Sequence, residues 1–201
     1  NNKIFCFSTI TSMIIMLSMV GPALLIPLYV QNALGLSALL SGLVIMPGAI
    51  INGIMSVFTG KFYDKYGPRP LIFTGFILLI SCTFLLCFLK VDTSYTYLIV
   101  IYAIRMFAVS LLMMPINTTG INALKTEDIS HGTAIMNFGR VMAGSLGTAL
   151  MVTFMSIGAQ WVVSSSEHAS KEMIQRQSVA VGVDVSFALV TVFVIIAFVL
   201  A

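Results

Sequence analysis

The chain has 201 residues, of which 59% are hydrophobic and 8% are charged, and its mean hydropathy is +1.05. This composition lies outside that of water-soluble domains and indicates a protein that folds in a lipid bilayer. The net charge of +3 is scattered, and no Lys/Arg stripe alternates with aromatic residues, so nucleic-acid binding is not indicated.

Six stretches of the chain are apolar and long enough to cross a bilayer core of about 30 Å, which takes about 20 helical residues. Alternation with a period of two residues, the sign of membrane β-strands, is missing. The sequence therefore predicts an all-α integral membrane protein, a bundle of six transmembrane helices without a soluble domain. The predicted spans are approximately 4–28, 38–59, 71–89, 97–116, 132–157 and 185–201.

The two chain ends suggest a segment of a longer polypeptide, because the chain begins at Asn1 without Met and stops inside an apolar run at Ala201. In the first span, Pro22 and Pro27 each remove a backbone donor, so we expect a kink there.

A short charged segment, 60–70, follows the second span, and we expect it to be a loop that turns the chain at the membrane surface. Its carboxylate could bind helix N-terminal amides or an arginine, and its cations could pair across the bundle, so that the loop latches one conformation. Alternatively, the loop is solvated and its cations only follow the positive-inside rule. The candidate gating residues are Gly60, Asp64, Lys65, Gly67 and Arg69.

Two arginines lie within predicted spans, Arg105 in the fourth and Arg140 in the fifth. A central cation costs at least about 2.5 to 3.5 kcal/mol on insertion scales, so each needs a carboxylate, carbonyls or water. Both either line a central cavity or tie down neighbouring carbonyls, with Arg105 favoured for the cavity and Arg140 for the structural role. Asn117 and Asn137 either contact a substrate or form hydrogen bonds between helices.

In the fifth span, Gly139, Ala143 and Gly147 recur every four residues, a small-residue face on which another helix can pack closely. The longest connection is then predicted over 159–183 and includes Trp161, Glu167, His168 and Arg176. Asp184 would begin the last span, as an N-cap, an interface residue or a proton carrier.

The alternation of six spans places the N-terminus, segment 60–70 and the turn at Lys125 on one side of the membrane. That side carries five positive residues against three on the other, which favours a cytoplasmic location for it. The five are Lys3, Lys61, Lys65, Arg69 and Lys125. The three cysteines lie in apolar runs without metal or redox spacing, and no metal site or cofactor is indicated.

Three segments in this order carry a family resemblance. The pattern Gly60-x-x-x-Asp64-Lys65-x-Gly67-x-Arg69 resembles the cytoplasmic loop between the second and third helices of a six-helix half in the major facilitator superfamily. Segment 27–47, which starts Pro-Leu-Tyr-Val-Gln, resembles the start of the C-terminal half of the fourteen-span drug:proton antiporters. Segment 132–149, with Asn137, Arg140 and Gly144, resembles the penultimate helix of that branch.

The resemblance implies one half of a major facilitator fold, built from two three-helix repeats of inverted topology, with an N-terminal half of the same polypeptide as partner. It further implies proton-coupled multidrug efflux by alternating access in the cell membrane, with small amphipathic substrates and protons as the transported species. An uptake or export carrier for a small metabolite or sugar is the alternative, and a membrane scaffold or sensor is a further one.

Motifs of other function classes are missing from the sequence. No Gly-x-Ser-x-Gly, no His-Glu-x-x-His and no pair of intramembrane aspartates occurs, so an intramembrane enzyme is not indicated. No phosphate-binding loop of the Gly-x-x-x-x-Gly-Lys-Ser/Thr type occurs either, so this segment gives no support for ATP as the energy source.

Overall fold

The computed structural model describes residues 2–165 and 171–201, and in these ranges it contains six long helices and two short 3-10 helices, with no strand. The long helices are α1 (Lys3–Asn32), α2 (Ala38–Tyr66), α3 (Pro68–Leu85), α4 (Tyr95–Asn122), α5 (Ile129–Ser165) and α6 (Lys171–Leu200), and the 3-10 helices are η1 (Leu86–Phe88) and η2 (Thr126–Asp128). Each long helix is apolar enough to cross a membrane. The predicted all-α, six-helix membrane fold is therefore confirmed.

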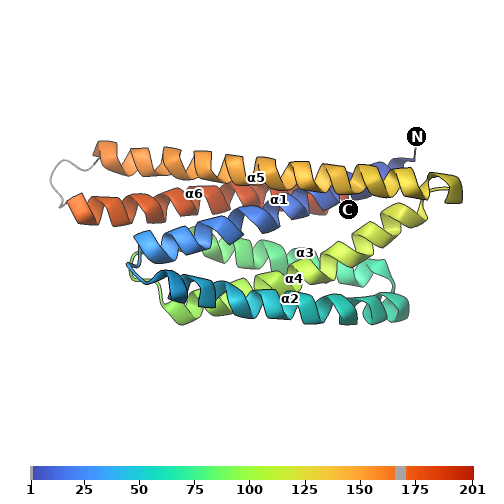
Figure 1. Cartoon of the computed structure of the whole chain (residues 1–201), viewed down its shortest axis with the longest axis horizontal. Helices are drawn as coiled ribbons and strands as arrows, with labels where there is room; N and C mark the ends of the chain where they lie inside the picture. Colours follow the sequence, from blue (N-terminus) through green and yellow to red (C-terminus); the bar gives the residue numbers. More distant parts are fainter. Residues whose placement is uncertain (1, 166–170) are drawn as a thin grey trace.

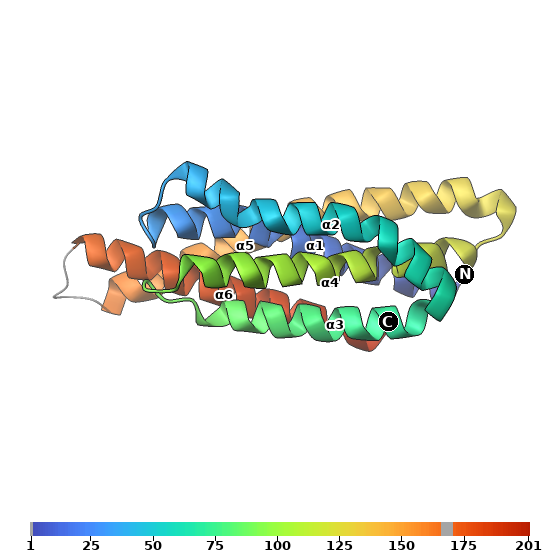
Figure 2. The ribbon, with the colours of Figure 1, turned by 90° about the horizontal axis from the view of Figure 1, so that it is seen from below.

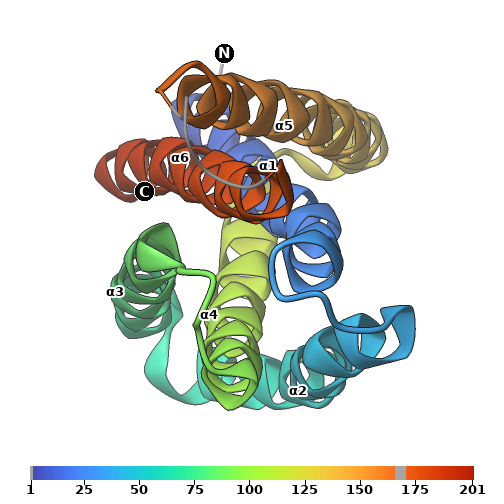
Figure 3. The same cartoon turned by 90° about the vertical axis from the view of Figure 1, so that its left-hand side faces the viewer.

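The six helices form two groups of three, and the first helix of each group packs against the second and third helices of the other group. Along the chain they run alternately in opposite directions, so α1 and α4 are antiparallel (Figure 1). α1 packs against α5 and α6, whereas α4 packs against α2 and α3; α1 also contacts α4, and α3 contacts α6. Exchanging α1, α2 and α3 for α4, α5 and α6 leaves this pattern unchanged, which is the arrangement of two inverted three-helix repeats. Figure 3 shows the exchange end-on, with α1 beside α5 and α6, and α4 between α2 and α3.

The segment 60–70 is not a loop, and this expectation was wrong. α2 continues to Tyr66 and α3 begins at Pro68, so only Gly67 separates the two helices. Gly67 has a φ of 77°, a backbone conformation that residues other than glycine rarely adopt. A proline in the first helical turn loses no backbone hydrogen bond, so Pro68 can start α3 directly after this bend.

The connection predicted over 159–183 is also helical over most of its length. α5 has 37 residues and α6 has 30, so α5 is about 55 Å long at about 1.5 Å per residue and exceeds the bilayer core. A hydropathy window finds only the apolar part of such a helix. Trp161 and Arg176 lie in α5 and α6, Asp184 lies well inside α6 rather than at its start, and Glu167 and His168 lie outside the described residues.

α5 and α6 pack closely against each other where two glycines bring their backbones into contact. A β-carbon on Gly158 would lie 2.8 Å from the Cα atom of Gly182, and one on Gly182 would overlap the carbonyl oxygen of Met155. In lipid, helices associate through such close packing, since no hydrophobic force favours one apolar partner over another.

The start of α1, the bend at Gly67 and the turn between α4 and α5 lie at the same end of the bundle (Figures 1 and 2). The side-chain amide of Asn2 donates a hydrogen bond to the carbonyl oxygen of Ala123 and thus ties the N-terminal end of α1 to the end of α4. The five positive residues counted above belong to these segments, so the structure gathers them at one end.

Replacing Gly182 by alanine should lower the melting temperature of the detergent-solubilised protein, because the added methyl group forces α5 and α6 apart. The free energy of unfolding should fall by about 1 to 3 kcal/mol, the usual cost of overpacking. Gly42→Ala is the matched control, since a β-carbon at Gly42 meets no atom within 4 Å among the described residues. Equal melting curves for the two variants would contradict the packing described here.

Candidate functional site

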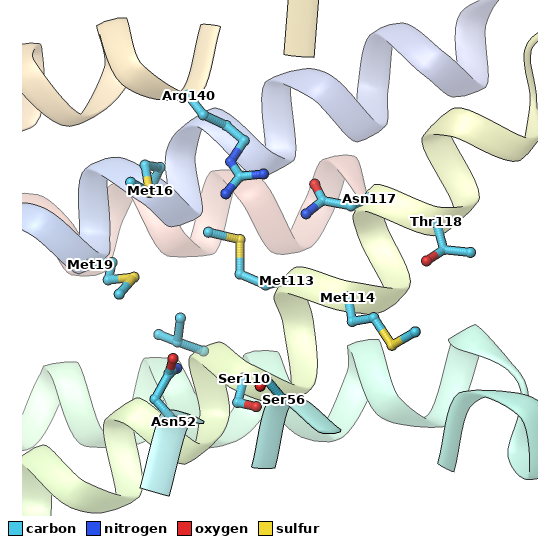
Figure 4. Close-up of a pocket in the computed structure, with 11 residues that line it drawn as sticks. Met16, Met19, Asn52, Ser56, Ser110, Met113, Met114, Asn117, Thr118 and Arg140 are labelled. Atoms are coloured by element: carbon cyan, nitrogen blue, oxygen red, sulfur yellow. The ribbon is translucent and has the colours of Figure 1, made fainter. Parts of the chain in front are cut away.

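A cavity of about 420 Å³ lies against four helices, α1, α2, α4 and α5. Among the described residues, α3 and α6 contribute nothing to its lining, and they lie on the other side of the bundle in Figure 3. Figure 4 shows the lining side chains converging from these helices. They are Met16, Met19, Asn52, Ser56, Val109, Ser110, Met113, Met114, Asn117, Thr118 and Arg140.

One face of α4 provides most of this lining. Its six contributions fall in adjacent pairs three to four residues apart, from Val109 and Ser110 to Asn117 and Thr118, which is the spacing of a single helix face. Asn52 and Ser56 are likewise one turn apart on α2. The face combines methionine with small polar residues, so it can adapt to an apolar ligand body and still offer hydrogen bonds.

Both asparagines of the lining already form hydrogen bonds within the bundle. Asn117 accepts a hydrogen bond through Oδ1 from the hydroxyl of Ser12 on α1 at 3.0 Å. Asn52 on α2 donates through Nδ2 to the carbonyl oxygen of Met106 on α4 at 3.1 Å. Both asparagines thus connect two helices at the cavity wall.

A second, mostly apolar cavity of about 340 Å³ adjoins the first and shares Met19 and Asn52 with it. Tyr102 and Met106 of α4 form part of its wall, opposite Ile45 of α2. The two cavities together offer a compartment with several polar side chains beside an almost wholly apolar one, which suits a ligand with both kinds of surface.

Arg140 reaches from α5 into the larger cavity, where its guanidinium lies near Met16, Met113 and Asn117 (Figure 4). Its Nε atom is buried and has no hydrogen-bond partner in the described part of the chain. The side chain as a whole is half-buried, so its charge is only partly shielded from water and faces the cavity without a partner among the described lining residues.

Arg105 is placed differently, completely buried between α4 and α1 and away from both cavities. It donates through Nη2 to the backbone oxygen of Ser18 and, at 3.2 Å, to the Ser18 hydroxyl. Nε and Nη1 have no partner within the described ranges. Arg140 therefore lies at the cavity and Arg105 ties two helices, which reverses the order that we expected from the sequence.

The remaining candidates on α5 occupy two faces. Asn137 is exposed and is not part of the cavity lining. The small-residue face lies against α1, where a β-carbon on Gly139 would be 3.0 Å from Sδ of Met13 and one on Gly147 would be 3.0 Å from the backbone of Leu17. Ala143, between them, is buried.

The candidate gating residues lie at the end of α2 and the start of α3, outside the cavity lining. Asp64 and Arg69 are exposed, and Lys65 lies over the ring of Tyr66 with Nζ 5.1 Å from the ring centroid. Gly60 lies nearest to the cavity, since a β-carbon there would be 3.3 Å from Cε of Met114, a lining residue.

Sequence reasoning missed the role of Asp184. Its carboxylate accepts the backbone N–H of Leu89 at 3.0 Å and so fastens the end of η1 to α6. Tyr29 of α1 donates to the carbonyl oxygen of the next residue, Lys90, at 2.5 Å. Two spans thereby hold the turn between α3 and α4, a contact between distant segments that no local pattern indicates.

Comparisons with known proteins agree with this architecture. The model of the Major Facilitator Superfamily matches residues 1–148. The chain is 44% identical over 150 residues to the uncharacterized MFS-type transporter YhcA of Bacillus subtilis, a match that covers 75% of this chain and 28% of that protein. It is 38% identical over 170 residues to the lincomycin resistance protein LmrB of Listeria monocytogenes, a match that covers 85% of this chain and 36% of LmrB.

The multidrug export protein EmrB of Escherichia coli is 29% identical over 134 residues, which cover 66% of this chain and 26% of EmrB. The chain thus spans 26% to 36% of the length of these three relatives.

Arg105→Ala should destabilise the protein far more than Arg140→Ala, because it empties a closed site between α1 and α4 and removes the bonds to Ser18. The free energy of unfolding should fall by about 2 to 4 kcal/mol in Arg105→Ala. It should fall by less than about 1 kcal/mol in Arg140→Ala, because that side chain already faces a cavity. Thermal melting of the solubilised variants measures both. If the two variants melt alike, the different placement of the two arginines is wrong.

Proposed function

Since the chain belongs to the major facilitator superfamily, we propose that it forms one six-helix half of a secondary active transporter that exports amphipathic small molecules. The observation that carries this proposal is the cavity between α1, α2, α4 and α5, with its methionines, amides and adjoining apolar compartment. Two relatives bear names of this kind, a lincomycin resistance protein and a multidrug export protein.

The cavity of this chain forms one wall of the transport site in this proposal, and an N-terminal half of the same polypeptide supplies the opposite wall. The much greater length of the relatives supports it. The two halves rock about the site and expose it to each side of the membrane in turn, as in other carriers built from inverted repeats.

We assign the energy source to a proton gradient. Among the described residues, no Asp or Glu lines the cavity of this half, so in this scheme the acid that carries the proton lies in the facing half. The family and the six apolar helices make the protein a multi-pass membrane protein. The five positive residues at the end that contains Gly67 support a cytoplasmic location for that end.

Asp64, Lys65 and Arg69 form a latch in this scheme, at the cytoplasmic end of the cleft between the halves. Their exposure in the isolated half supports this role, since they are open to contact from a facing half. A bias of about 1 to 3 kcal/mol towards one access state would shift the populations about 5- to 150-fold.

The complete transporter should move an amphipathic dye against its gradient in everted membrane vesicles when a proton gradient is imposed. An uncoupler should abolish this movement, and membranes without the protein serve as control. Dye movement that persists without a proton gradient would contradict the proton coupling. No movement of any dye or drug, together with uptake of a sugar or metabolite, would contradict export.

Asp64→Asn in the complete transporter should slow dye efflux at least severalfold while the amount of protein in the membrane stays near normal, because the latch loses its charged contact. Asp64→Glu, which keeps the carboxylate, should retain most of the rate. Initial efflux rates normalised to membrane abundance measure the effect. An unchanged rate in Asp64→Asn would remove the latch.

A further inference from the structure

Within residues 2–165 and 171–201, no carboxylate lies in the cavity beside the guanidinium of Arg140. Its Nε atom is buried without a hydrogen-bond partner among the described residues. No Asp or Glu in the described part of the chain lines the cavity that it enters. The side chain is half-buried and its guanidinium has no anionic neighbour among the described lining residues, so an anionic group that enters the cavity can pair with it.

The neighbours of Arg140 cannot replace that group. Met16 and Met113, which lie beside the guanidinium in Figure 4, provide only neutral thioethers. Asn117, whose Oδ1 accepts a hydrogen bond from Ser12 at 3.0 Å, is a neutral amide and offers no counter-charge either.

Arg105 provides the contrast that makes the position of Arg140 informative. It is closed in on all sides and donates to the carbonyl oxygen and hydroxyl of Ser18, so it forms part of the helix packing. Arg140 instead extends into a cavity of about 420 Å³ with room for another group. A guanidinium presents paired N–H donors that match the two oxygens of a carboxylate.

We propose that Arg140 binds a carboxylate in this cavity, one that belongs either to a transported substrate or to an acidic side chain of the facing half. The inference rests on the proposed function, because it takes the cavity to be the transport site. If the substrate supplies the carboxylate, the carrier takes amphipathic acids or zwitterions, with the apolar body against the methionines. If the facing half supplies it, Arg140 neutralises that acid and releases it when the halves separate.

The test measures the local potential at Arg140 without requiring transport. In the complete transporter with its other cysteines replaced, Met113→Cys places one thiol beside the guanidinium. Its rates of reaction with an anionic and a cationic methanethiosulfonate of similar size are measured in membrane vesicles and divided by the rates for free cysteine. The normalised anionic-to-cationic ratio is then compared for Arg140, Arg140→Gln and Arg140→Lys.

Arg140→Gln should lower this ratio about threefold or more, since a unit charge a few ångströms away acts on the two reagents with opposite sign. Arg140→Lys should keep the ratio of the parent. Lys125→Gln removes one exposed charge far from the cavity and should leave the ratio unchanged. Membrane abundance of each variant shows that it is folded.

The absolute ratio separates the two sources of the carboxylate. A parent ratio above one that falls to about one in Arg140→Gln assigns the site to a substrate carboxylate. A parent ratio near one that falls below one assigns it to an acid of the facing half. A ratio that Arg140→Gln does not change overturns the proposal. Dye efflux is measured separately. A shifted ratio without dye efflux would support the carboxylate site and contradict the export function. Dye efflux with an unchanged ratio would support the export function and contradict the carboxylate site.

Discussion

The crossing of α1 and α4 is the contact on which the rest of this half depends. Helices in lipid gain nothing from hydrophobic burial against one another, so their positions are fixed by close packing and by polar contacts. At this crossing Arg105 of α4 donates to the backbone and hydroxyl of Ser18 on α1. Each of these two helices then carries the second and third helices of the other triplet. The bond between Arg105 and Ser18 therefore joins the two repeats.

The same pair of helices also forms the floor of the cavity. α1 contributes Met16 and Met19 while α4 contributes a whole face, and α2 and α5 close the sides. Ser12 and Asn117 form a second bridge between α1 and α4, at 3.0 Å, about two turns from Ser18 along α1 and about three turns from Arg105 along α4. Polar residues inside the spans thus serve first to hold the helices in register. Only those that extend past the crossing, above all Arg140, remain available to a ligand.

The sequence was sufficient for the fold class but not for the places where helices end or side chains point. Hydropathy finds apolar windows, so it recovers the six helices. It misses that α2 continues through Lys61 and Lys65, whose ammonium groups lie over the rings of Phe58 and Tyr66. The crowding of small residues around Arg140 suggested a structural role, yet those residues pack on α1 while the long arginine side chain reaches past them. Which arginine meets a cavity depends on how α4 and α5 are rotated against α1, and these rotations follow from packing between distant segments, such as Gly147 of α5 against Leu17 of α1.

The continuity of α2 changes how a latch at the membrane surface can act on the transport site. A loop at 60–70 would absorb a displacement of Asp64, whereas a single helix from Ala38 to Tyr66 transmits it. Asn52 and Ser56 lie on the same helix three and two turns before Asp64 and line the cavity. α2 contacts α4 extensively but α3 only sparsely, whereas α5 and α6 are held together by the contact of Gly158 with Gly182. In the proposed cycle, a change at the latch therefore reaches the cavity wall along α2, whereas α5, which carries Arg140, is packed against α1 and α6.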